Sequence, residues 1–90
     1  GERTRTTTFE AAGRTVMITV VDTSDDAVRV DGWLAPAAAA RVELRSPDAT
    51  VRTTADVAGR FVFDEVAHGL YQLTVYASGS PPVVTTAILL

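Results

Sequence analysis

Alternation of apolar and polar residues is the dominant pattern along the chain. Between positions 41 and 45, Val42 and Leu44 alternate with three charged residues, and similar alternation covers residues 60–64 and 71–76. A period of two places alternate side chains on opposite faces of a β-strand, one face buried and the other in solvent. The pattern predicts eight strands, at residues 3–9, 15–22, 28–34, 41–46, 50–54, 60–65, 70–77 and 83–89.

Turn-forming residues separate these segments. Gly13, Gly59 and Gly69 lie between predicted strands, and Pro47-Asp48 and the run 78–82 interrupt the alternation elsewhere. Turn signals every eight to twelve residues or so are typical of a β-sandwich or barrel. Residues 35–41 are rich in alanine, which favours helix, but isolated helices of this length are marginal. We therefore expect an all-β fold with a loop at 35–41, with one helical turn there as the alternative.

Length and charge limit the classes of function. The chain has 90 residues, which corresponds to a single domain. Its net charge is −3, and its eight arginines are scattered apart from Arg3 and Arg5. Nucleic-acid binding requires clustered positive charge that neutralises phosphates, so we expect no nucleic-acid partner.

The chain contains no cysteine, lysine or asparagine. Without cysteine, disulfides, zinc–thiolate sites and thiol catalysis are excluded. No apolar run approaches the roughly 18 residues that a membrane span requires, and nothing resembles a signal peptide, so we expect no membrane insertion. These features do not identify a compartment; a cytoplasmic location is the first expectation and an extracellular one the alternative.

Three motifs resemble the carboxypeptidase regulatory-like domain. Residues 30–33 (Val-Asp-Gly-Trp), followed by 40–44, are similar to its first two core strands. Residues 53–63 resemble its hairpin of threonine, an acid and then Gly-Arg-Phe-x-Phe. Residues 68–75 resemble its closing Gly-x-Tyr-x-Leu-x-Val strand. Together the motifs cover about half the chain in the family's order.

This resemblance implies a seven-to-eight-stranded Greek-key β-sandwich of the transthyretin-like or prealbumin-like type. Residues 1–90 would form one domain, with an N-terminal hairpin at 1–27 and the family core at 28–90. Such domains are usually non-catalytic accessories, surface modules or stalks. The runs 8–11 and 82–85 further resemble small actinobacterial proteins of this fold, whose genes often lie near sigma-factor genes; that link is one of association only.

Relatives of this fold that carry out chemistry do not match the chain. One branch closes an isopeptide bond between lysine and asparagine, and this chain has neither residue. The hydroxyisourate hydrolase branch uses several histidines and a C-terminal Tyr-Arg-Gly-Ser, whereas this chain has one histidine and ends in Ala-Ile-Leu-Leu. We therefore expect a protein that is not an enzyme, with no catalytic residues and no cofactor.

The remaining polar candidates are predicted to be structural. His68 precedes Gly69 in a predicted turn and lacks the orienting partner and nucleophile that a general base requires. The acids at positions 22, 25, 26 and 31 lack the spacing of a calcium loop, so we expect solvated turn residues, with weak calcium binding as the alternative. Asp56 falls in a turn and Asp64 on the polar face of a strand, not in one cleft. No metal site is expected.

Trp33 and Tyr76 are candidates for an interaction surface. If Val28, Val30 and Gly32 face inward, Trp33 faces solvent or marks a bulge, and the alternative is that it closes one end of the core. Tyr76 raises the same question, because positions 71, 73 and 75 already occupy the inner face of its strand. An exposed aromatic side chain is an anchor for a protein partner or a platform for a sugar.

The last predicted strand, 83–89, is apolar on both faces, and Val84, Ile88 and Leu90 are its candidate contact residues. A strand with two apolar faces must lie within a sheet or be covered by another chain. It therefore predicts a protein partner or a homodimer formed through the C-terminal strand. The first strand, by contrast, carries threonine and arginine on both faces, which is typical of an edge strand.

Two functions follow from these features. The first is a non-catalytic module that mediates protein–protein interaction in a small bacterial protein, where it could have a regulatory role. This function rests on the absence of recognisable chemistry and on the apolar C-terminal strand. The alternative is an extracellular accessory, surface or carbohydrate-binding module. It rests on the usual role of the family that the motifs resemble and on the aromatic side chains of Trp33 and Tyr76.

Overall fold

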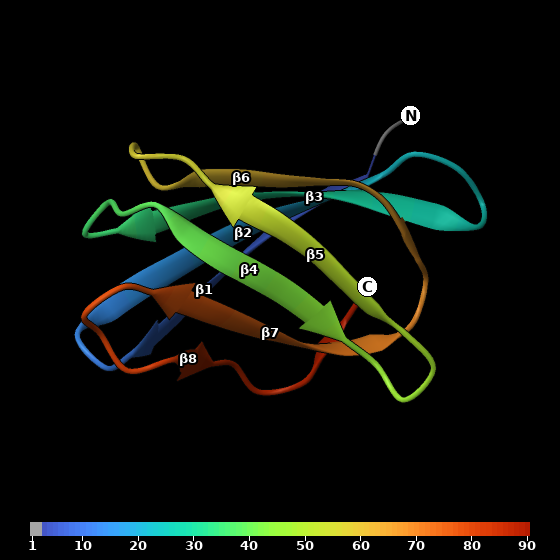
Figure 1. The fold of residues 1–90 in the computed structure, drawn as a ribbon. Coiled ribbons are helices and arrows are strands. Elements are labelled where there is room, and N and C mark those ends of the chain that lie inside the picture. The colour runs from blue at the N-terminus through green and yellow to red at the C-terminus, as the bar shows by residue number, and fades with distance from the viewer. Residues whose placement is uncertain (1–2) are drawn as a thin grey trace.

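Two antiparallel β-sheets pack face to face in the computed structural model, which describes residues 3–90 (Figure 1). The first sheet has the strand order β1-β2-β3-β6 and the second β5-β4-β7-β8, with β9 also paired to β7. The strands are β1 (Thr4–Ala11), β2 (Arg14–Asp22), β3 (Ala27–Ala35), β4 (Ala40–Arg45), β5 (Thr50–Ala55), β6 (Arg60–Ala67), β7 (Leu70–Ala77), β8 (Val83–Val84) and β9 (Ile88–Leu89). The predicted all-β sandwich is confirmed.

Three connections carry the chain from one sheet to the other, after β3, β5 and β6 (Figure 1). As a result, β6 pairs with β3 and β7 pairs with β4, although other strands separate them along the chain. Residues 36–39, where alanine favours helix, form the loop between β3 and β4. Within residues 3–90 no helix is long and apolar enough to cross a membrane.

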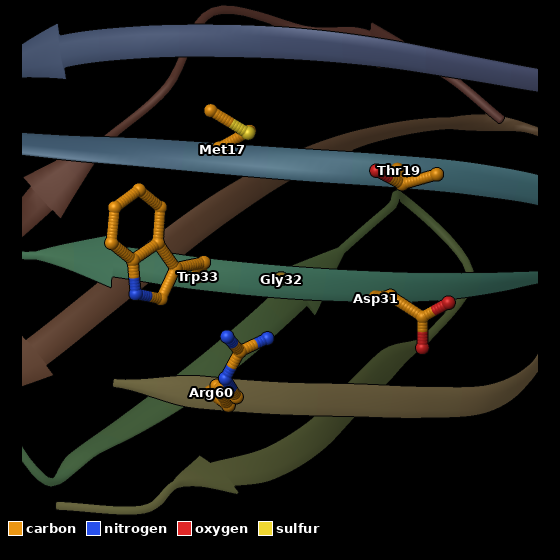
Figure 2. Close-up of a pocket in the computed structure, with 6 residues that line it drawn as sticks. All are labelled: Met17, Thr19, Asp31, Gly32, Trp33 and Arg60. Carbon is orange, nitrogen blue, oxygen red and sulfur yellow. The ribbon is translucent and has the colours of Figure 1, made fainter. Parts of the chain in front are cut away.

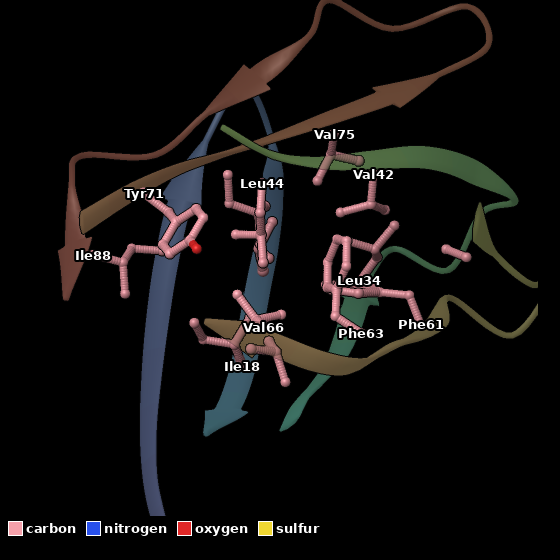
Figure 3. Close-up of a cluster of buried hydrophobic side chains, with 14 of the residues drawn as sticks. Ile18, Leu34, Val42, Leu44, Phe61, Phe63, Val66, Tyr71, Val75 and Ile88 are labelled. Carbon is pink, nitrogen blue, oxygen red and sulfur yellow. The ribbon is translucent and has the colours of Figure 1, made fainter. Parts of the chain in front are cut away.

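The core consists of the alternate side chains that the sequence pattern places on one face of each strand. Val42, Leu44 and Val75 of the second sheet face Leu34 and Phe63 of the first (Figure 3). Their neighbours along each strand lie on the outer faces of the sheets, as the period of two predicts. Full burial of one such aliphatic side chain stabilises the fold by about 1.5–3 kcal/mol, so this interior layer is the main source of stability.

One core position requires glycine. Gly32 on β3 is paired with Phe61 on β6, and the Phe61 ring lies over the glycine where a side chain would otherwise stand. Phe61 in turn packs edge-on against Phe63, with ring centroids 6.0 Å apart. The absence of a Cβ at Gly32 therefore makes room for an aromatic pair at the centre of the core.

The turn between β5 and β6 is held by a single carboxylate. Asp56 Oδ1 accepts hydrogen bonds from the amides of Ala58 at 2.9 Å and Arg60 at 3.0 Å. Gly59 adopts a positive φ of 81°, a conformation that glycine reaches without steric penalty. Its carbonyl accepts a 2.8 Å hydrogen bond from the Leu34 amide, so the turn is fastened to the end of β3.

The C-terminal segment departs from the prediction. One continuous strand was expected at 83–89, but the structure divides it into β8 and β9, which makes nine strands rather than eight. Thr85 explains the interruption: its amide donates to the Leu73 carbonyl at 2.9 Å, and its hydroxyl accepts from the Leu73 amide at 3.1 Å. Because the side chain replaces a backbone carbonyl, the regular ladder ends there.

Candidate functional site

Trp33 lies on the solvent-facing side of the first sheet. Its neighbours along β3, Gly32 and Leu34, face inward, so the period of two turns the indole outward, where 40% of the residue is exposed. Met17 on β2 and Arg60 on β6 are its direct cross-strand partners. The expectation that Trp33 faces solvent is confirmed, and the alternative that it closes one end of the core is wrong.

A shallow depression surrounds Trp33, with a volume of about 280 Å³. Figure 2 shows Trp33 and Asp31 on the central strand, Met17 and Thr19 on the strand at one side, and Arg60 on the strand at the other. The Arg60 guanidinium extends toward β3, between Trp33 and Asp31 in this view. The depression thus combines an apolar half, formed by the indole and the thioether, with a polar half.

Backbone and ion-pair contacts position these side chains. The hydrogen bond from the Leu34 amide to the Gly59 carbonyl aligns β3 with the start of β6, and so sets Arg60 beside Trp33. Asp31 accepts a 3.1 Å hydrogen bond from Arg29 Nε on the same strand. Both partners are substantially exposed, so the pair adds little stability but directs the Asp31 carboxylate.

The chemistry available in the depression is that of binding. An indole and a thioether offer polarisable apolar surface, while a guanidinium and a carboxylate supply directed hydrogen bonds. Among the residues that the structure describes, no three side chains of histidine, aspartate or glutamate come together in a group that could hold a metal ion. A few polar groups around an apolar surface are what orient a bound partner or ligand.

The polar candidates from the sequence lie apart from this depression, with one exception. His68 is exposed in the turn between β6 and β7, with Nδ1 3.3 Å from the Leu90 carbonyl. Asp25 and Asp26 lie in the exposed loop between β2 and β3, whereas Asp31 belongs to the Trp33 depression. Asp56 is the carboxylate that holds the turn before β6, and Asp64 is exposed on β6.

The predicted contact residues of the C-terminal strand are not all on the surface. Val84 is exposed, but Ile88 and Leu90 are buried in the core with the rest of the interior apolar side chains. After the break at Thr85, Ile88 pairs with Tyr71 and lies beside its ring (Figure 3), and Leu90 belongs to the same buried cluster. Ile88 and Leu90 are therefore covered by their own chain, while Leu89 between them is exposed, which corrects the assignment of Ile88 and Leu90 to an interaction surface.

Tyr76 lies on the solvent face of the opposite, second sheet. The guanidinium carbon of Arg41 is 4.3 Å from the centre of its ring, a cation–π contact. Tyr76 and Trp33 are thus on opposite outer faces of the sandwich and do not share one site.

Beside Tyr76, one glutamate is enclosed by three arginines. Glu43 Oε2 accepts a 2.9 Å hydrogen bond from Arg52 Nε and lies 3.7 Å from Arg41 Nε, and Oε1 accepts a 3.3 Å hydrogen bond from Arg45 Nη2. We call this group the arginine ring. The Glu43 side chain is 8% exposed although it lies on the outer face, because the arginine side chains cover it.

The sequence contained part of the signal for the arginine ring. The run Arg-x-Glu-x-Arg at 41–45 places three charges on one face of a strand, and alternation alone predicts only that this face is polar. Arg52 completes the ring through the β4–β5 register, in which it is the direct partner of Glu43. That register depends on a hairpin geometry that the alternation pattern does not specify.

The hydrogen bond from Arg52 lowers the pKa of Glu43 from its ordinary value of 4.5. Burial acts in the opposite direction, and the positive charges of Arg52, Arg41 and Arg45 lower the pKa further. Because the folded-state pKa is the lower one, Glu43 stabilises the fold above the pKa of the unfolded chain. This contribution is lost as the pH falls below about 4.5 and through the folded-state pKa.

We expect Glu43→Gln to be less stable than the wild type at neutral pH and to approach it as the medium is acidified. Urea denaturation at a series of pH values from 7 down through about 4.5 and below measures this convergence. Arg52→Gln removes the main cause of the lowered pKa, so it should also flatten the dependence of the free energy of unfolding on pH. If the free energies of unfolding of the wild type and Glu43→Gln change in parallel with pH, the arginine ring does not affect the titration of Glu43.

Comparison of the chain with protein-family models, with curated proteins and with solved structures found no match. The resemblance to the carboxypeptidase regulatory-like domain thus remains a prediction that rests on the three motifs at 30–44, 53–63 and 68–75. What the structure establishes is the β-sandwich, with an exposed tryptophan on one outer face and an arginine ring on the other.

Proposed function

We propose that this chain is a non-catalytic binding module that contacts a protein partner through the outer face of the first sheet, centred on Trp33. The observation that carries the proposal is the exposed indole of Trp33 beside Met17, on a face that no other element of the described chain covers. Tryptophan is the residue most enriched among those that dominate the energy of protein interfaces, and methionine adapts its shape to a partner.

The polar residues around Trp33 support the same proposal. Arg60 and Asp31 flank the indole, and a polar rim around an apolar centre is the usual anatomy of an interface. Arginine is also enriched at such sites. The resemblance to a family of non-catalytic accessory domains agrees with a binding role, and the proposed Greek-key, transthyretin-like topology would present the outer sheet face without obstruction.

Trp33→Ala should strongly weaken partner binding without unfolding the domain. Loss of a central tryptophan anchor lowers affinity by at least about 30-fold, equivalent to about 2 kcal/mol. The partially exposed side chain contributes little to the core, so stability should change by less than about 1 kcal/mol. The measurement is affinity capture with the wild-type chain, identification of the bound protein, and titration calorimetry with that protein and each variant.

The matched control is Leu70→Ala, which also removes an exposed apolar side chain, away from the depression around Trp33. Leu70→Ala should retain the wild-type affinity for the partner. Equal losses for the two variants, or full retention of binding by Trp33→Ala, would contradict the proposed surface.

A second candidate function is carbohydrate binding at the same depression. It is favoured by the position of a carboxylate and a guanidinium, Asp31 and Arg60, beside an exposed indole, since directed polar groups and an aromatic face together orient a sugar. Trp33 is the only tryptophan in the chain, so its fluorescence reports on the site directly. Saturable fluorescence changes with a panel of oligosaccharides would favour this function, and their absence would leave the protein partner as the occupant.

A further inference from the structure

The arginine ring on the second sheet is a binding feature separate from the Trp33 face. Period-two alternation puts Arg41, Glu43 and Arg45 on the same face of β4, and the β4–β5 register adds Arg52 directly opposite Glu43. Three arginines surround one carboxylate, so the group carries an excess of two positive charges on a chain whose net charge is −3.

The central carboxylate organises the ring. Glu43 is 8% exposed, whereas the side chains of Arg41, Arg45 and Arg52 are 59%, 61% and 64% exposed. Arg52 and Arg41 contact Glu43 through Nε, the guanidinium nitrogen nearest the backbone. The two terminal nitrogens of each guanidinium group therefore lie beyond this contact. A guanidinium has five N–H donors, and each hydrogen bond to Glu43 uses one of them.

Because the arginine side chains are already held in place, a ligand that binds them pays a smaller entropic cost of ordering side chains. Holding one long, flexible side chain at an interface costs about 0.5–1.5 kcal/mol, and here contacts with Glu43 and with the Tyr76 ring already restrict the arginines. Guanidinium groups bind carboxylates through pairs of parallel hydrogen bonds, which are stronger than hydrogen bonds between neutral groups. The ring is therefore preorganised for anions.

We infer that the arginine ring binds an acidic peptide segment in extended conformation, laid along β4 on the outer face of the second sheet. Arg41 and Arg45 are four residues apart on one strand, about 13 Å at the strand repeat. An extended peptide repeats its side chains on one side every 6.8 Å or so, so acids four residues apart match this spacing.

The surroundings of the ring fit a peptide better than a long polyanion. Tyr76 borders Arg41, and exposed Val84 lies beside Thr74, the neighbour of Glu43 across the sheet, so apolar surface flanks the charges. A nucleic acid would extend past the ring over a chain that is acidic overall, where repulsion opposes it. A short acidic segment contacts only the ring and its apolar border.

The test is fluorescence anisotropy with a fluorescein-labelled peptide of alternating glutamate and threonine, at low salt and again at physiological salt. The wild type should bind this peptide saturably, and affinity should fall as salt is added. The triple variant R41Q/R45Q/R52Q should bind at least about tenfold more weakly, because it loses every charged donor of the ring. Absence of saturable binding to the wild type would overturn the inference.

The matched control is R3Q/R14Q/R29Q, which removes the same number of positive charges outside the ring. This control should bind the peptide nearly as the wild type does, and an equal loss of affinity would show that only overall charge matters. A DNA duplex of similar charge is the competing probe; tighter, ring-dependent binding of the duplex would overturn the choice of a peptide. Urea denaturation of each variant confirms that it is folded.

Glu43→Gln separates an organised ring from simple positive charge. The substitution makes the face more positive, so charge alone predicts tighter binding of the acidic peptide. The inference predicts weaker binding, by about threefold or more, because the arginines lose the carboxylate that orients them. Tighter binding by Glu43→Gln would therefore refute the organising role. Because Trp33 lies on the opposite face, the result is independent of the proposed function.

Discussion

Gly32→Ala should destabilise the domain by about 3 kcal/mol, at the upper end of what overpacking a core position usually produces. A Cβ at this position would overlap the Cζ, Cε1 and Cε2 atoms of the Phe61 ring. Phe61 has little room to move, because it is buried and packs edge-on against Phe63. Relief would require β3 and β6 to separate or the aromatic pair to rotate out of its preferred conformation.

Urea denaturation followed by far-ultraviolet circular dichroism measures the effect of Gly32→Ala. The matched control is Gly69→Ala, where the nearest atom to a new Cβ would be the Tyr71 ring at 3.4 Å, an ordinary contact. If Gly32→Ala does not fold, Phe61→Leu in the same background removes the overlapping ring atoms and should restore a cooperative transition. Equal midpoints for Gly32→Ala and Gly69→Ala would contradict the steric explanation.

Leu44→Ala should lower the free energy of unfolding by about 3–4 kcal/mol, within the range measured for leucine truncation in cores. Leu44 is on β4, between β5 and β7 at the middle of the second sheet, and is 0% exposed. Its side chain faces the first sheet, so truncation leaves a cavity that neither sheet can close without moving as a whole. For a domain of this length, that loss is a large part of the total stability.

Leu70→Ala is the control for Leu44→Ala, since the same atoms are removed from a residue that is 56% exposed. The free energy of unfolding of Leu70→Ala, measured in urea, should lie within about 0.5 kcal/mol of the wild-type value. A loss at Leu70 comparable to that at Leu44 would mean that the turn before β7 contributes more to the core than its exposure indicates. A small loss at Leu44 would mean that the interior can collapse around the cavity.

The two proposed surfaces have a common structural origin. The sandwich fills its inward positions with apolar side chains, so recognition by either sheet uses its outward positions. On the first sheet these positions present an indole and a thioether, and on the second they present three guanidinium groups. One domain could therefore engage an apolar surface on one side and an acidic segment on the other.

The strands and the inward-facing residues were predictable from the sequence. Seven of the eight expected strands correspond to β1 through β7, with ends that differ by a residue or two. The reason is local: a period of two in hydrophobicity fixes which side chains of a strand share a face, whatever strand lies beside it. The same reasoning placed Gly59 in a turn, but it left open whether Trp33 and Tyr76 face solvent or close the core.

What the sequence pattern left open was decided by contacts between distant segments. The partnership of Trp33 with Met17 and Arg60, and that of Glu43 with Arg52, depend on strand order and register, which alternation alone does not specify. The C-terminal segment is apolar on both faces in the sequence, and only the hydrogen bonds between Thr85 and Leu73 show that it breaks there. Alternation thus determined the strands and their inner faces. Tertiary pairing decided which outward side chains contact one another, because these contacts join residues far apart in the chain.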